Sequence, residues 1–226
     1  MIEYDGNITG WAYLVMSRLD GTLLEELWEK MDYDNKIIII HELGLLIREV
    51  HSLPTQGLEE IDCCWHTFIA GQINACVERH QSLELPAYLL QKIPEYLTSI
   101  SQVLLHIGKP VILTGEYTPM NFLVKQIEGV WHIDGLIDFG DAMLGLPAYD
   151  LLGPSAFLIQ GDKRLLKEFL ISYGYMPNKL TAELSHKLTA LMLLHRYSNL
   201  NVQIRIKGWQ NKVYSMQDLE NLIWGF

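Results

Sequence analysis

The sequence has little cysteine and no long uncharged apolar run. Its three cysteines, two of them adjacent at Cys63 and Cys64, are too few for a disulfide framework. No apolar segment approaches the about 20 residues that a membrane-spanning helix needs. The first ten residues, MIEYDGNITG, lack the basic and apolar regions of a signal peptide. These absences predict a cytoplasmic protein with no membrane partner.

Positive charge is also scarce. The chain has 17 Lys and Arg against 27 Asp and Glu, which gives a formal net charge of −10. This balance argues against a nucleic-acid partner and is compatible with a cationic substrate, although many proteins are acidic only for solubility. With 49% hydrophobic and 19% charged residues, the 226-residue chain can bury a sizeable core in one or two small domains.

The most informative stretch spans residues 111–150. Two apolar runs, 111–113 and 122–124, predict strands on either side of a polar loop that contains Glu116 and Asn121. A further β-rich run ends at Asp138. Three oxygen-bearing side chains therefore stand at the ends of neighbouring strands. Mg²⁺ prefers oxygen ligands, and phosphoryl transfer needs an acid beside the incoming hydroxyl.

This pattern resembles the catalytic and metal loops of the aminoglycoside phosphotransferase and choline kinase group, distant relatives of the protein kinases. The group usually has His-Gly-Asp, a short linker, Asn, and later Ile-Asp-Phe-Gly. Here the residues are Thr114-Gly115-Glu116, a linker, Asn121, and later Ile137-Asp138-Phe139-Gly140. Thr replaces the usual His, and Glu replaces the usual catalytic Asp. The similarity continues through residues 145–151 and extends over most of the chain.

The resemblance implies a mainly helical α+β fold and transfer of the γ-phosphate of ATP (or GTP) to a hydroxyl of a small molecule. The implied catalytic residues are Glu116, Asn121 and Asp138: Glu116 would orient the hydroxyl, while Asn121 and Asp138 would hold Mg²⁺. The residue types alone leave other roles open. Asp and Asn are common in turns, and Glu116, one methylene longer than Asp, is explained almost equally well as a non-catalytic acceptor of loop hydrogen bonds.

The resemblance also implies a division of the chain. Residues 1–19 would be a remnant of the small N-terminal lobe, a hairpin followed by a hinge whose backbone at Ser17 and Leu19 contacts adenine. Residues 20–226 would form a kinase-like C-terminal lobe, with the catalytic and metal loops at 111–141. From the residues alone, the first segment predicts two strands around a turn at 5–7.

A complete kinase carries a Gly-rich loop, a strand Lys and a helix Glu ahead of the hinge. These parts do not fit into the ten residues before Trp11. Three interpretations stay open: a truncated gene product, a lobe completed by a partner chain or by a second copy in a homo-oligomer, and a catalytically incompetent, pseudokinase-like binding module. A hydrolase is disfavoured because the sequence has no Gly-x-Ser-x-Gly motif.

Other polar residues are candidates for supporting roles. By the resemblance, Asp150 accepts loop N–H groups and His51 lies beneath the catalytic loop. The alternatives are an ordinary acid at a helix start and a histidine at a helix end, which the helix dipole favours. The Thr114 hydroxyl is expected to bond the loop backbone, and Asp141 to face the substrate entrance or cap a turn.

A helix expected over residues 181–206 carries polar side chains that a substrate cleft would suit. These are His186, His195 and Arg196. Packed or surface histidines are the commoner alternative.

Overall fold

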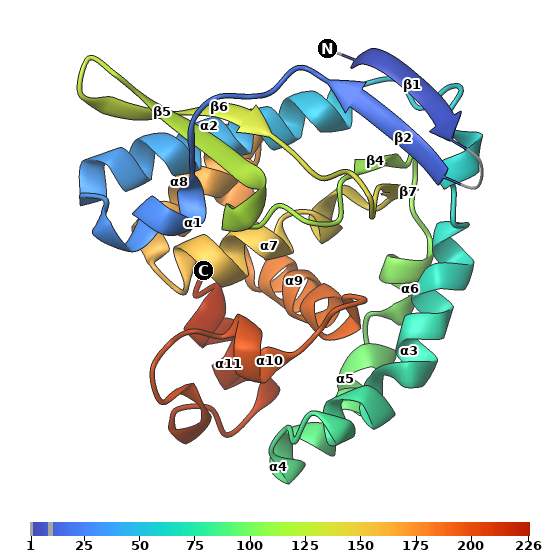
Figure 1. The fold of residues 1–226 in the computed structure, drawn as a ribbon. Helices are drawn as coiled ribbons and strands as arrows, with labels where there is room; N and C mark the ends of the chain where they lie inside the picture. Colours follow the sequence, from blue (N-terminus) through green and yellow to red (C-terminus); the bar gives the residue numbers. More distant parts are fainter. Residues whose placement is uncertain (1, 9–10) are drawn as a thin grey trace.

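The computed structural model describes residues 2–8 and 11–226. Helices dominate it, and the short strands lie in the upper part of the view in Figure 1. The mainly helical α+β fold expected from the sequence is confirmed. None of the helices in the described residues combines the length and hydropathy that crossing a bilayer requires.

The chain begins with an antiparallel hairpin, β1 (Ile2–Ile8) against β2 (Trp11–Met16). The predicted turn at residues 5–7 is wrong. Those residues lie inside β1 and pair with residues 12–14, and the last residue of β1, Ile8, pairs with the first residue of β2, Trp11. The apolar run of β2 supplies pairing partners along β1, and this pairing overrides the local turn preference of the Asp-Gly-Asn sequence.

Two small sheets hold the central stretch. One has the order β3 (Thr22–Leu23), β5 (Phe122–Ile127), β6 (Val130–Leu136). The other pairs β4 (Val111–Leu113) with β7 (Met143–Gly145). The strands predicted from the apolar runs are therefore present, and both sheets are antiparallel.

The longest helix, α2 (Tyr33–Ser52), is capped by Asp32, whose side chain accepts a hydrogen bond from Asn35 N. It packs along β6 and against α8 (Lys163–Tyr173). The close approach of the two helices depends on Gly44, because a Cβ there would lie 2.7 Å from the Phe169 carbonyl oxygen. Helix α2 thus links the strands to the helical body of the molecule.

The remaining helical elements cover the other sides of the core (Figure 1). They are α1 (Leu24–Leu27), the 3₁₀ turns Trp28–Lys30, Glu59–Ile61, Pro119–Asn121, Pro147–Tyr149, Pro177–Lys179 and Trp209–Asn211, α3 (Trp65–Ser82), α4 (Ala87–Leu90), α5 (Ile93–Thr98), α6 (Ser101–Leu105), α7 (Leu152–Pro154) with the π-helical turn Ser155–Ile159, α9 (Ala182–Leu194), α10 (Leu200–Gln203) and α11 (Met216–Ile223).

The helix expected over residues 181–206 is broken. Helix α9 ends at Leu194, and His195 leaves the helical conformation, with φ of −58° and ψ of 139°. Arg196 N then donates to the Tyr149 hydroxyl at 2.8 Å. Asn199 starts α10 by accepting a hydrogen bond from Asn201 N at 3.1 Å. The Tyr149 hydroxyl and the Asn199 side chain thus accept from backbone N–H groups that a continuous helix would have bonded internally. The interruption of the helix shapes the site described next.

Candidate active site

The loop between β4 and β5, residues 114–121, is held from below by Asp150. One carboxylate oxygen of Asp150 accepts from Thr114 N at 3.0 Å and the other from Gly115 N at 3.1 Å. Gly115 has a φ of +77°, a conformation that favours glycine. The prediction that Asp150 accepts loop N–H groups is confirmed, so the start of the loop is fixed by a buried carboxylate.

His51, in the last turn of α2, supports this carboxylate. Its Nε2 lies 3.2 Å from Asp150 Oδ2, and its Nδ1 lies 2.9 Å from the Tyr173 hydroxyl. Burial raises the pKa of Tyr173, so its hydroxyl stays neutral. The prediction for Thr114 is wrong, because its buried Oγ1 has no hydrogen-bond partner among the described residues. The anchoring of the loop runs through the backbone N–H of Thr114 instead.

Asn121 ties the catalytic loop to the segment that contains Asp138. The side-chain Nδ2 of Asn121 donates to the Glu116 backbone carbonyl oxygen at 2.9 Å. The backbone carbonyl oxygen of Asn121 accepts from Ile137 N at 2.9 Å. Asp138 follows with a φ of +66°, uncommon for a residue other than glycine, and its Oδ1 accepts from Gly140 N at 3.1 Å. Glu116, Asn121 and Asp138 therefore lie around one loop junction.

Three carboxylates interact at this junction. The pKa of Glu116 is raised above its ordinary value, first by burial and then by the negative charges of Asp141 and Asp138. Asp141 is itself partly compensated, since its Oδ1 lies 3.2 Å from Arg196 Nη1 and its Oδ2 accepts from the Tyr197 hydroxyl at 2.9 Å. The Glu116 carboxyl therefore releases its proton less readily than an exposed glutamate does.

Among the described residues, no three His, Cys, Asp or Glu side chains form a metal-binding cluster. The donors expected from the sequence are a different set, the Asn121 amide oxygen and the exposed Asp138 carboxylate. Asn121 commits its Nδ2 to Glu116 O, so the amide oxygen, the atom expected from the sequence to be a ligand, points away from that carbonyl. Mg²⁺ usually takes one or two such protein oxygens and completes its shell with water and phosphate. The donor chemistry therefore fits Mg²⁺.

Ser17 and Leu19, the expected adenine-contact residues, lie in the connection between β2 and β3. The Leu19 side chain lies against β6, with Cδ1 2.8 Å from the point where a Cβ on Gly135 would stand. Since β6 leads directly into Asp138, this connection runs over the same sheet that carries the metal-loop carboxylate.

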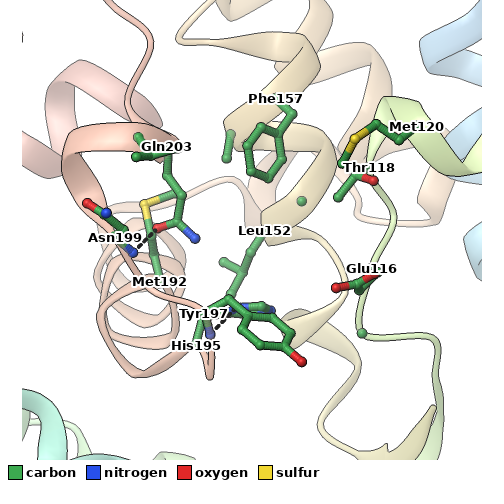
Figure 2. A pocket seen from close by; sticks show the side chains of 14 residues that line it. Glu116, Thr118, Met120, Leu152, Phe157, Met192, His195, Tyr197, Asn199 and Gln203 are labelled. Carbon is green, nitrogen blue, oxygen red and sulfur yellow. Dashed lines mark hydrogen bonds between the residues drawn. The ribbon is translucent and has the colours of Figure 1, made fainter. Parts of the chain in front are cut away.

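A cavity of about 290 Å³ opens beside Glu116 (Figure 2). Its wall is made by residues from the catalytic loop, α7, the π-helical turn, α9, α10 and the break between them. These residues are Gly115, Glu116, Thr118, Met120, Leu152, Gly153, Ala156, Phe157, Met192, His195, Tyr197, Asn199, Val202 and Gln203.

Of the histidines proposed for a substrate cleft, His195 lines this cavity and His186 does not. His186 is held elsewhere, with Nδ1 2.9 Å from Glu220 Oε1 and Nε2 2.9 Å from Ser99 Oγ. His195 stacks on Tyr149 at a ring-centroid distance of 4.6 Å. Burial lowers the pKa of His195 to about 4, so its ring is neutral at neutral pH.

Sequence reasoning missed most of the cavity wall. Phe157 enters it from the π-helical turn, and Asn199 and Gln203 enter it because the chain breaks after α9. The Gly153-Pro154 interruption was the local signal, since a Cβ on Gly153 would lie 2.7 Å from the Tyr117 carbonyl oxygen. That glycine lets α7 touch the catalytic loop and brings the turn behind it to the site.

The fold is that of the kinase-like small-molecule phosphotransferases. The structure of the GDP complex of wild-type aminoglycoside 2'-phosphotransferase-IIIa matches 98% of this chain and 73% of its own, with a TM-score of 0.68 and 18% identity. The structure of aminoglycoside-3'-phosphotransferase of type VIII matches with a TM-score of 0.57 and 19% identity. The match covers 85% of this chain and 71% of that protein's chain. The structure of macrolide 2'-phosphotransferase MphH from Brachybacterium faecium matches with a TM-score of 0.53 and 18% identity. The match covers 80% of this chain and 61% of that protein's chain.

A profile of the phosphotransferase enzyme family, APH, matches residues 2–184, and the chain belongs to this family. The resemblance drawn from the catalytic and metal loops is thereby confirmed. Among curated proteins, the chain is 23% identical over 202 residues to lysine-specific demethylase JMJ21 of Arabidopsis thaliana, covering 73% of this chain and 21% of that protein. The chain thus corresponds to a minor part of that relative.

Proposed function

We propose that this chain transfers the γ-phosphate of ATP (or GTP) to a hydroxyl of a small molecule. The main support is the meeting of Glu116, Asn121 and Asp138 around one loop junction that Asp150 anchors. These are the residue types that phosphoryl transfer requires, and they lie beside a cavity of about 290 Å³ that has room for an acceptor. The cytoplasmic location remains a prediction from the sequence.

In this proposal Glu116 accepts a hydrogen bond from the acceptor hydroxyl and directs its oxygen at the γ-phosphorus. Asn121 fixes the loop around Glu116 through the 2.9 Å bond to the Glu116 carbonyl oxygen. Asn121 and Asp138 would hold Mg²⁺, which when bound neutralises charge on the phosphates. Positioning and charge stabilisation supply most of the rate in such reactions, so the longer Glu116 side chain remains compatible with transfer.

The nucleotide is proposed to lie on the side of residues 17–19. Residues 1–19 would then act as the remnant of the small lobe and residues 20–226 as the large lobe. A nucleotide donor is supported by the structural relative solved with GDP, and a hydroxyl acceptor by relatives named for aminoglycosides and macrolides. A partner chain or a second copy of this one is the proposed source of further phosphate contacts.

A second candidate is a binding module that does not catalyse transfer. One observation favours it: Glu116 stands where the family usually has the catalytic Asp. This candidate predicts nucleotide or small-molecule binding without phosphorylated product.

Titration with MgATP tests the proposed site. Wild-type protein is expected to bind MgATP, and Asp138→Ala to weaken binding by about tenfold or more, because a ligand carboxylate is lost. Asp134→Ala is the matched control, since Asp134 lies on the neighbouring strand β6 and pairs with Lys125 at 2.7 Å. Equal binding by wild type and Asp138→Ala, or binding by neither, would contradict the proposal. Radiolabel transfer from γ-labelled ATP then separates the enzyme from the binding module.

A further inference from the structure

The cavity beside Glu116 is lined mainly by apolar side chains. They converge from separate elements: the turn before β5, α7, the π-helical turn, α9 and α10 (Figure 2). The apolar members are Met120, Leu152, Ala156, Phe157, Met192 and Val202. A surface built in this way favours the apolar part of a ligand, because burying apolar area is the main favourable term in such contacts.

Carboxylates are scarce in the same wall. Glu116 is the only acidic residue among the described residues that line the cavity. Asp141 lies next to it, but Arg196 and Tyr197 already occupy its two oxygens. An acceptor with several ammonium groups would have to place most of them against methionine, leucine and phenylalanine side chains. Burying a charge without a partner is strongly unfavourable.

Apart from Glu116, the polar side chains of the wall are neutral, and the acceptor atoms of Gln203, Asn199 and His195 each accept one hydrogen bond. Gln203 Oε1 accepts from Asn199 N at 3.3 Å, and Asn199 Oδ1 accepts from Asn201 N at 3.1 Å. His195 Nδ1 accepts from Tyr197 N at 3.2 Å. The amide nitrogen of Gln203 is left as a donor on the cavity side (Figure 2). Donors of this kind suit ether, carbonyl or hydroxyl oxygens and do not pair with ammonium groups.

Cationic groups already lie near the apolar wall. The guanidinium of Arg205 lies over the Phe157 ring, 5.0 Å from its centroid. Arg196 is paired with Asp141, with Nη1 3.2 Å from Oδ1. The Arg205 guanidinium disfavours a second cation nearby, whereas an uncharged ligand meets no such repulsion.

We propose that the cavity takes an uncharged alcohol with an apolar body and excludes acceptors that carry several ammonium groups. This inference rests on the proposed function, because Glu116 is the group expected to meet the hydroxyl. A cavity of about 150 Å³ holds one benzene molecule, so about 290 Å³ accommodates a ring together with a short chain. The acceptor hydroxyl would lie at the Glu116 end and the apolar body against Phe157 and Met192.

The test measures binding of defined probes in the absence of nucleotide. Hexyl β-glucoside and phenyl β-glucoside are the uncharged probes, and kanamycin is the polycation, each titrated calorimetrically. Met120→Glu and Val202→Glu add a carboxylate to the rim, and both residues are more than half exposed, at 52% and 56%, so the protein tolerates the charge. Met176→Glu is the matched control, since Met176 is 57% exposed and lies outside the cavity.

Wild type and Met176→Glu are expected to bind the glucosides and not kanamycin. Met120→Glu and Val202→Glu should each weaken glucoside binding by about fivefold or more and gain kanamycin binding. Tighter binding of kanamycin than of either glucoside by wild type, no glucoside binding, or glucoside binding unchanged in both rim variants would overturn the inference.

The two proposals fail separately. Protein that binds the glucosides but transfers no phosphate to any acceptor keeps this inference and loses the proposed function. Protein that phosphorylates kanamycin keeps the proposed function and loses this inference. Thermal unfolding followed by circular dichroism verifies that the rim variants are folded.

Discussion

The base of the catalytic loop and the wall of the adjacent cavity are built in opposite ways. The base is a buried polar network, in which Asp150 joins two loop N–H groups to His51 and Tyr173. The wall is apolar, and it contains residues as exposed as Met120 and Val202. A network of hydrogen bonds fixes the geometry that a reaction needs. An apolar wall tolerates substitution of its side chains, so ligands of different shape can be selected there without disturbing that geometry.

The strongest expected contrast between the two regions is catalytic. Glu116→Gln removes the carboxylate that orients the hydroxyl, so kcat for phosphoryl transfer should fall by about a hundredfold or more. Glu26→Gln, an exposed acid on α1, is the control and should leave kcat unchanged. Unaltered transfer by Glu116→Gln would assign Glu116 the non-catalytic role that its residue type also allows.

A change in the base of the loop should act on stability. Asp150→Asn keeps the size of the side chain but presents an amide N–H₂ to one of the two N–H donors, so the free energy of unfolding should drop by about 2–3 kcal/mol. Denaturant titration measures this drop. Asp134→Asn breaks only the exposed pair with Lys125 and should cost less than about 1 kcal/mol. If both substitutions lowered the free energy of unfolding equally, the hydrogen bonds of Asp150 would stabilise the protein no more than an exposed ion pair does.

Stability should also depend on pH through His195. Its folded pKa is lowered to about 4 from an ordinary value of 6.5, so the unfolded chain binds the proton more readily. The contribution is fully present above pH 6.5 and is lost as the pH falls toward 4. Unfolding curves of wild type and His195→Phe across this range should show a shallower slope for the variant. Parallel slopes would argue against a buried neutral ring.

The smallest expected contrast comes from replacing one tyrosine by phenylalanine in each region. Tyr173→Phe removes the hydroxyl that bonds His51 and should cost about 1 kcal/mol of unfolding free energy. Tyr197→Phe removes an exposed hydroxyl that bonds Asp141 and should cost less than about 0.5 kcal/mol. The same denaturant titration measures both, and a larger loss for Tyr197→Phe would reverse the comparison.

The base of the loop was predictable from sequence and the wall was not. Apolar runs bounded by turn residues predicted β4, β5 and β6, because their pattern is local. The resemblance of residues 114–150 to the catalytic and metal loops of the family implied the loop and its anchor, Asp150. The wall depends on the break after α9, which the Tyr149 hydroxyl stabilises by accepting from Arg196 N. That contact joins distant segments, and helical periodicity carries no trace of it.

The N-terminal hairpin gives a second example of the same limit. The Asp-Gly-Asn sequence at residues 5–7 has a strong turn preference, yet it pairs with β2 along its length. Local preference indicated a turn, whereas pairing between strands decided where the chain reverses. Local signals thus predicted which elements exist more reliably than they predicted where the chain turns.

A crystal structure of the protein with Mg²⁺ and a non-hydrolysable ATP analogue tests the central claim most directly. The prediction is an ion about 2.0–2.1 Å from Asn121 Oδ1 and from an Asp138 carboxylate oxygen, with Glu116 directed toward the cavity. A Mg²⁺–nucleotide complex bound away from these two residues, or oxygens of Asn121 and Asp138 that face separate surroundings in the complex, would contradict it.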